Sequence, residues 1–120
     1  MIQEMDICEY IKIRSKEDIL IDLRERLMFE FGTVPGAVNI PLESIKELYR
    51  LPKDQNIYVF CQTGEISAEI VELLSDAGYN AFNLIGGYRE YLRWKIAAES
   101  ADVSFATGGN RIDCNILESR

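Results

Sequence analysis

The chain has 120 residues, of which 48% are hydrophobic, and this is enough for one domain with an ordinary core. Twenty acidic residues against 13 basic ones give a net charge of −7, which argues against a nucleic-acid backbone as a partner. No apolar run approaches the roughly 20 residues that span a bilayer, and no secretory signal is visible at the start, so we expect no membrane association.

The residue types available for catalysis and metal binding are restricted, because the sequence contains no histidine. This excludes Cys–His and Ser–His–Asp catalysis and any histidine-based metal site. The three cysteines, Cys8, Cys61 and Cys114, lie far apart in the sequence, so we predict no metal. Their odd number and unpaired spacing do not indicate a disulfide framework, and this favours a reducing cytoplasm.

Helix-like and strand-like segments alternate along the chain. In chain order, the sequence predicts a helix at Asp6–Lys12, a strand at Ile19–Asp22, a helix at Arg24–Glu30, a strand at Ala37–Ile40, a helix at Leu42–Leu51, a strand at Ile57–Phe60, a helix at Ser67–Ala77, a strand at Ala81–Leu84 and a helix at Tyr88–Ala98. The strands show little polar alternation, which is typical of parallel sheets buried on both faces. The pattern therefore predicts an α/β fold with helices on both faces of a sheet.

The periodic pattern fades after Ala98. We therefore predict one domain over residues 1–98 and an unassigned extension at residues 99–120. The extension could be a tail without fixed structure, an added strand or the start of a further module.

Cys61 lies between the end of a predicted strand and the start of a predicted helix, in the segment IYVFCQTGEIS at residues 57–67. Backbone N–H groups converge at such a junction and the helix dipole favours negative charge, so the thiolate is favoured there. Half ionisation of an ordinary thiol at pH 7 requires about 2 kcal/mol, and a helix terminus typically supplies about 0.3–1 kcal/mol. The N–H groups of the loop must therefore contribute as well.

The loop that follows Cys61 offers several such groups. Gly64 can adopt the left-handed conformation that turns successive N–H groups inward. Gln62 and Thr63 add neutral donors, whereas Glu65 would oppose an anionic sulfur if it points inward. The competing interpretation is that Cys61 is a small buried hydrophobic residue at a strand end.

Two further sets of residues have structural and functional interpretations. Cys8 lies in a short amphipathic stretch and is predicted to pack in the core, and we assign no role to Cys114. Asp22 and Arg24 stand at a strand end and could be catalytic. A structural charge pair that orders the following loop is the favoured interpretation.

Three segments of the sequence resemble, in the right order, the signatures of rhodanese-like domains. They are IDLRERLMFEFGTVPGAVNIPL at residues 21–42, CQTGEIS at residues 61–67 and NLIGGYREY at residues 83–91. The resemblance covers about three quarters of the chain, from Ile7 to Tyr91. It implies a three-layer α/β domain with a central, mostly parallel five-stranded sheet flanked by helices.

The resemblance also implies a function. The family's cysteine corresponds to Cys61, which would take a sulfane sulfur from a small donor or a persulfidated protein. It would hold this sulfur as a persulfide and pass it to cyanide, a thiol or a carrier protein. The loop N–H groups of Gln62 to Ser67 would cradle the terminal sulfur, and no cofactor is implied. The GGY ending is most similar to rhodanese domains fused to CoA-disulfide and persulfide reductases, so a fused or separate disulfide reductase is an expected partner.

The sequence departs from the family pattern at several positions. Thr33 stands where many members have histidine and Met28 where many have glutamate, and both are far from the loop in sequence, so we expect little catalytic effect. Ile66 occupies the place of an arginine in CxxGxRS-type loops, and Glu65 adds an acid. Because a negative charge disfavours a dianion, we expect thiosulfate to be a poor donor.

Three other functions remain as alternatives. Phosphatase chemistry in related folds uses Cys-x5-Arg, in which the arginine clamps the phosphoryl oxygens, but Ser67 stands at that position here. A non-catalytic binding or regulatory module stays open because of the acidic loop and the unassigned extension. A thiol reductase would need a resolving cysteine, and neither Cys8 nor Cys114 forms a Cys-x-x-Cys arrangement.

Overall fold

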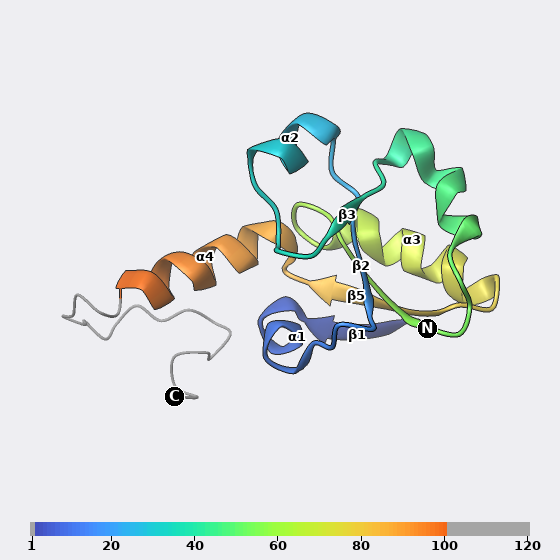
Figure 1. The fold of residues 1–120 in the computed structure, drawn as a ribbon, viewed down its shortest axis with the longest axis horizontal. Coiled ribbons are helices and arrows are strands. Elements are labelled where there is room, and N and C mark those ends of the chain that lie inside the picture. Colours follow the sequence, from blue (N-terminus) through green and yellow to red (C-terminus); the bar gives the residue numbers. More distant parts are fainter. Residues whose placement is uncertain (1, 101–120) are drawn as a thin grey trace.

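The computed structural model of the chain describes residues 2–100, and its centre is a parallel sheet of five strands (Figure 1). The strand order is β1-β5-β4-β2-β3, and each neighbouring pair is parallel. The strands are β1 (Gln3–Asp6), β2 (Ile19–Asp22), β3 (Val38–Asn39), β4 (Asn56–Phe60) and β5 (Asn80–Ile85). Because all five run in one direction, their carboxyl ends lie along one edge of the sheet.

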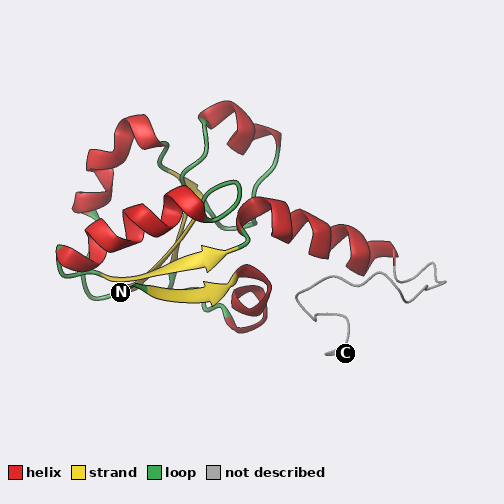
Figure 2. Cartoon of the chain, turned by 180° about the vertical axis from the view of Figure 1, so that it is seen from behind, coloured by secondary structure: helices red, strands yellow, loops and turns green. Residues whose placement is uncertain are grey.

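Helices cover both faces of this sheet, which gives three layers (Figure 2). They are α1 (Ile7–Ile13), α2 (Arg26–Phe31), the 3-10 helix η1 (Leu42–Arg50), α3 (Glu65–Asp76) and α4 (Gly87–Ser100). Side chains of α3 and η1 pack on one face, and side chains of α1 and α4 pack on the other. α2 buries no residue and lies beyond the sheet (Figure 1).

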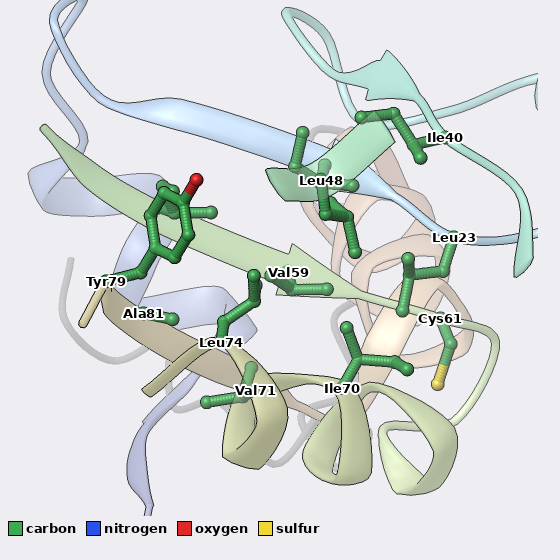
Figure 3. Close-up of a cluster of buried hydrophobic side chains, with 12 residues drawn as sticks. Leu23, Ile40, Leu48, Val59, Cys61, Ile70, Val71, Leu74, Tyr79 and Ala81 are labelled. Atoms are coloured by element: carbon green, nitrogen blue, oxygen red, sulfur yellow. The ribbon is translucent and has the colours of Figure 1, made fainter. Parts of the chain in front are cut away.

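The central strand β4 shows why the sheet is buried on both sides. Ile57 and Val59 face the cluster under α3, which Figure 3 shows, and Tyr58 and Phe60 face the cluster under α1 and α4. These four side chains are at most 6% exposed. Successive side chains of a strand point to opposite faces, so an unbroken apolar run is what a central strand with two covered faces requires.

The predicted fold class is confirmed, and each predicted strand and helix has a counterpart in the structure. Three details differ. The strand β1 was not predicted, because Gln3–Asp6 is a half-exposed edge strand with the polar sequence QEMD. The helix predicted at Leu42–Leu51 is a 3-10 helix with a kink at Ser44, and the helix predicted to start at Ser67 begins at Glu65.

Two other expectations concern the ends of the chain and the membrane. The predicted extension at residues 99–120 lies outside the described residues from residue 101 on, so the division after residue 98 stays a prediction. Within residues 2–100, the structure contains no helix of the length and apolar character that crossing a membrane requires.

Tyr10 makes the stability of the fold sensitive to high pH. It is 1% exposed, its ring centroid lies 4.5 Å from that of Tyr58, and burial raises its pKa to about 12, partly offset by Arg14. The unfolded chain loses this phenol proton near pH 10 whereas the folded chain keeps it. The contribution of Tyr10 to the free energy of unfolding is therefore fully present below pH 10 and falls as the pH rises from 10 to 12.

We expect the free energy of unfolding, measured with urea at fixed ionic strength, to fall by about 1–3 kcal/mol between pH 10 and 12. The variant Tyr10→Phe keeps the ring and lacks the ionisable group, so its decline over this range should be smaller. Parallel curves for the two proteins would show that Tyr10 does not cause the loss.

Candidate active site

Cys61 follows β4 directly and sits at the carboxyl edge of the sheet, where its side chain is 5% exposed (Figure 3). Three residues, Gln62, Thr63 and Gly64, then separate it from the first residue of α3. Gly64 has φ of 100° and ψ of −3°, the left-handed conformation that residues with a Cβ rarely adopt. This glycine lets the chain reverse within one short loop, so that α3 starts beside the sulfur.

The sulfur of Cys61 is a hydrogen-bond acceptor at the start of α3. The backbone N–H of Gly64 donates to Sγ at 3.1 Å, and the backbone N–H of Ser67 donates at 3.3 Å. The first N–H groups of a helix have no partner within the helix and form the positive end of its dipole. Both effects stabilise negative charge on Sγ.

The carbonyl groups of the same loop are held away from the sulfur by the start of α4. The N–H of Tyr88 donates to the carbonyl of Cys61 at 2.9 Å, and the N–H of Arg89 donates to that of Gln62 at 3.0 Å. The contact requires Gly87, because a Cβ there would lie 2.5 Å from the carbonyl oxygen of Cys61. The loop can therefore turn its N–H groups inward while its carbonyls remain satisfied.

Asn83, on β5, forms hydrogen bonds with both Ser67 and Gly64. Its side chain is 2% exposed, and its Oδ1 accepts a hydrogen bond from the hydroxyl of Ser67, which is fully buried. Its Nδ2 donates to the carbonyl of Gly64 at 3.2 Å. The Ser67 oxygen in turn lies 3.3 Å from Sγ of Cys61 and can accept the thiol proton. Asn83 thus fixes the orientation of the hydroxyl next to the sulfur.

Asp22 and Arg24 form a buried ion pair at the end of β2, with side chains that are 0% and 5% exposed. The carboxylate accepts from Arg24 Nη2 at 2.9 Å and from the hydroxyl of Thr33 at 2.7 Å. The guanidinium also donates to the carbonyl of Gly32 and lies 3.9 Å from the ring centroid of Tyr88. Its Nε and Nη2 donors are therefore used by Asp22 and Gly32, and its charge is balanced by a buried carboxylate.

A cavity of about 550 Å³ opens in front of Cys61. Its apolar lining residues come from four separate segments: Leu23, Met28, Pro41, Leu42 and Ile66. The polar lining residues are Arg24, Glu25, Glu43 and Gln62. Among them Arg24 carries the only positive charge, and it is already paired, so the cavity is apolar with two carboxylates and no uncommitted cation.

The structure brings some of the predicted site residues to the sulfur and leaves others at the surface. Gly64 and Ser67 contact Sγ, and Gln62 and Ile66 line the cavity. The remaining two residues of the predicted loop, Thr63 and Glu65, are exposed and do not line it. Within residues 2–100, no three Cys, Asp or Glu side chains form a group that could hold a metal ion.

Three residues near Cys61 were not singled out from the sequence: Glu25 and Glu43 line the cavity, and Asn83 orients Ser67. Met28, noted in the sequence only as a departure from the family pattern far from the loop, lies in the cavity wall. A local signal existed only for Asn83, which is a polar residue inside an otherwise apolar predicted strand. The others are exposed residues in sequence segments far from the loop, where no pattern marks them.

A sequence model described as the rhodanese-like domain matches residues 9–93 of the chain. The chain belongs to the rhodanese-like domain family. The family predicted from the three sequence signatures is thereby confirmed.

Several relatives of this rhodanese-like chain are named as sulfurtransferases. Human thiosulfate:glutathione sulfurtransferase is 33% identical over 89 residues, which cover 61% of this chain and 77% of the relative. The adenylyltransferase and sulfurtransferase UBA4 of Meyerozyma guilliermondii is 32% identical over 94 residues, 71% of this chain and 22% of the relative. This chain spans only about a fifth of the length of such two-function relatives. These names support a rhodanese-type sulfurtransferase at the level of the family.

Solved structures show the same fold. The crystal structure of reduced Bacillus anthracis CoADR-RHD has a TM-score of 0.70 and 29% identity, covering 82% of this chain and 17% of that one. A rhodanese-like domain protein from Staphylococcus aureus has a TM-score of 0.66 and 29% identity, covering 72% of this chain and 88% of that one.

The Ser67–Asn83 contact should be visible as a coupling energy. Each buried group loses its partner when the other is truncated, so Ser67→Ala and Asn83→Ala should each cost about 1–3 kcal/mol of unfolding free energy. The double variant should lose less than the sum by about 0.5 kcal/mol or more. Asn80, which is exposed on the same strand, provides the control, and Ser67→Ala with Asn80→Ala should be additive. Additivity for both pairs would contradict the contact.

Two ion pairs with the same 2.9 Å separation should differ in their effect on stability. Asp22→Asn leaves Arg24 buried without its counter-charge, and we expect a loss of about 3–5 kcal/mol in urea unfolding. Glu30→Gln breaks the Arg26–Glu30 pair, whose side chains are 79% and 52% exposed, and we expect at most about 1 kcal/mol. Equal losses of unfolding free energy would show that burial does not make the Asp22–Arg24 pair more important for stability than the exposed pair.

Proposed function

We propose that this chain is a sulfurtransferase that carries a sulfane sulfur as a persulfide on Cys61. The observation that carries the proposal is the pair of backbone N–H groups that donate to Sγ of Cys61 at the start of α3. Such a position stabilises a thiolate, which is the attacking form of the thiol, and also a charged persulfide. The sulfurtransferase names of the relatives support the same reaction class.

The proposed cycle has two displacements. The Cys61 thiolate attacks the terminal sulfur of a persulfide donor, a sulfur–sulfur bond forms on Cys61, and the donor's sulfur–sulfur bond breaks to release its thiolate. An acceptor thiolate or cyanide then attacks the terminal sulfur on Cys61. The bond between the acceptor and the terminal sulfur forms as the sulfur–sulfur bond to Cys61 breaks, and the Cys61 thiolate is restored.

The loop residues have distinct roles in this proposal. The N–H groups from Gln62 to Ser67 would cradle the terminal sulfur, and Gly64 supplies the turn that directs them inward. The buried pair of Asp22 and Arg24 keeps the neighbouring loop in place. Thr63 and Glu65 contribute through their backbone, since their side chains are exposed and lie outside the cavity lining.

We further infer that thiosulfate is a poor donor for this protein, although human and Escherichia coli relatives are named for it. Thiosulfate is a dianion, and the cavity offers the carboxylates of Glu25 and Glu43, whereas its one cation, Arg24, is paired with Asp22. Negative charge near a dianion lowers its local concentration and its affinity. A neutral or protein-borne persulfide fits the cavity better.

Two features of the cellular setting belong to the proposal. A disulfide reductase, fused or separate, is a candidate partner, which the likeness to a domain of the larger CoADR-RHD chain supports. A reducing compartment such as the cytoplasm is part of the proposal as well, because the cycle starts from a free Cys61 thiol.

The proposal predicts a covalent intermediate on one residue. After exposure to glutathione persulfide, intact-protein and peptide mass spectrometry should show one added sulfur on the Cys61 peptide, discharged by cyanide. Thiosulfate at the same concentration should load Cys61 at least about tenfold more slowly, because of the carboxylates in the cavity.

Cys61→Ser is the control for this experiment and should show no added sulfur. Absence of the adduct in folded, reduced wild-type protein would overturn the sulfurtransferase proposal in favour of a binding or regulatory module. Efficient loading from thiosulfate would leave the carrier role intact and overturn only the inference about the donor.

A further inference from the structure

An exposed apolar surface surrounds the entrance to Cys61. Met28, Leu42 and Ile66 line the cavity and are 44%, 41% and 47% exposed. On α2, Leu27 and Phe31 continue this surface away from the cavity, with exposed fractions of 64% and 85%. We call these five residues the apolar collar. Large side chains exposed together beside a reactive group are typical of a contact surface for another molecule.

The geometry of α2 supports this interpretation. The helix has six residues and buries none of them, so its apolar side chains do not serve the core. Met28 and Phe31 stand three positions apart and Leu27 and Phe31 four, spacings that place side chains next to one another on a helix surface. An apolar helix surface thus adjoins the wall of the cavity that contains Cys61.

The charges at the cavity entrance that have no ion-pair partner are both negative. Glu25 and Glu43 line the cavity, are exposed, and form no ion pair with another described residue. Glu25 also makes no capping hydrogen bond to α2. Arg24 is held by Asp22, and Arg26 on α2 is paired with Glu30 at 2.9 Å. A molecule that approaches Cys61 therefore meets apolar side chains flanked by two unpaired carboxylates.

We propose that the apolar collar together with Glu25 and Glu43 is a docking surface for a cysteine persulfide carried on a polypeptide, with apolar residues next to that cysteine and lysine or arginine beyond them. This inference rests on the proposed function and names the donor class for the same site. Complementary charge steers association and selects partners, and the apolar collar contributes through the burial of hydrophobic surface.

The same surface discriminates against small anionic persulfides. Glutathione carries more negative than positive charge at pH 7, so its persulfide gains nothing from Glu25 and Glu43 and covers little of the collar on α2. It can still enter a cavity of about 550 Å³ and react with Cys61. A basic polypeptide gains both the charge and the apolar contact, so it should react faster at equal concentration.

The experiment compares two synthetic peptides. Each has one cysteine in the same apolar segment, converted to the persulfide, and is flanked on both sides by lysines in one peptide and by glutamates in the other. The second-order rate of sulfur transfer to Cys61 is measured by mass spectrometry at low and high salt. The ratio of the two rates is the readout, because it cancels any change in the intrinsic reactivity of Cys61.

For the wild type we expect the lysine peptide to react on the order of tenfold faster at low salt, with the ratio falling towards one near 1 M salt. The double variant Glu25→Lys with Glu43→Lys should reverse the ratio. The matched control is Glu69→Lys with Glu72→Lys, which makes the same change in net charge at exposed positions of α3 outside the cavity lining. It should keep the wild-type ratio.

The apolar part of the surface is tested with Met28→Ser and Phe31→Ser together. This variant should slow transfer from both peptides several-fold without changing their ratio, because it removes apolar contact and no charge. Leu73→Ser with Ile96→Ser is the control, since these side chains are 50% and 60% exposed on α3 and α4 and belong to neither the cavity nor the collar. It should transfer sulfur as the wild type does.

The outcomes separate this inference from the proposed function. Equal rates for the two peptides at low salt, or an equal shift in the Glu69 and Glu72 control, would overturn the docking surface while Cys61 still accepts sulfur from glutathione persulfide. Failure of every donor to load Cys61 would overturn both proposals.

Discussion

The site depends on how the backbone of one short loop is oriented around Cys61. For its N–H groups to converge on the sulfur, its carbonyl groups must point elsewhere and still be satisfied. The first N–H groups of α4 meet this need by binding the carbonyls of Cys61 and Gln62, and Asn83 binds the carbonyl of Gly64. Gly87 makes the approach possible because no side chain stands between the two segments.

This arrangement explains why the rigid part of the site lies at the edge of the sheet. Cys61 follows β4 and Asn83 lies on β5, and both strands are in the interior of the sheet with side chains packed on its two faces. The sulfur and its partners are therefore fixed by the same packing that fixes the core. Much of the cavity wall is built differently, from α2 and the start of η1, where Met28, Leu42 and Glu43 are exposed.

The placement of charge separates structural from functional roles. Arg24 lies in the cavity lining, but it is paired with Asp22, donates to the carbonyl of Gly32 and lies over the ring of Tyr88. Glu25 and Glu43 have no such partners among the described residues. The unpaired charge at the entrance is thus negative, and this is the common ground for the expected weakness of thiosulfate and the proposed preference for a basic donor.

Local patterns in the sequence were sufficient for the order of the elements after β1, for the family and for the position of Cys61 at a strand–helix junction. Burial on both faces leaves an unbroken apolar run such as Ile57–Phe60, and Gly64 marks the turn before the helix. The structural interpretation of Asp22 and Arg24 also needed only neighbouring residues. The strand β1 was not predicted, because a polar edge strand has no apolar run that would mark it in the sequence. The roles of the loop residues stay predictions until transfer is measured.

Only the tertiary structure decided what surrounds the sulfur. Met28 and Glu43 reach the cavity, and Asn83 reaches Ser67, from positions 16 to 33 residues away in the sequence. Glu65, the acid next to the loop in sequence, faces solvent instead. A parallel sheet gathers the carboxyl ends of strands that are distant in sequence at one edge, so contacts there follow from the crossover connections and not from local residue patterns.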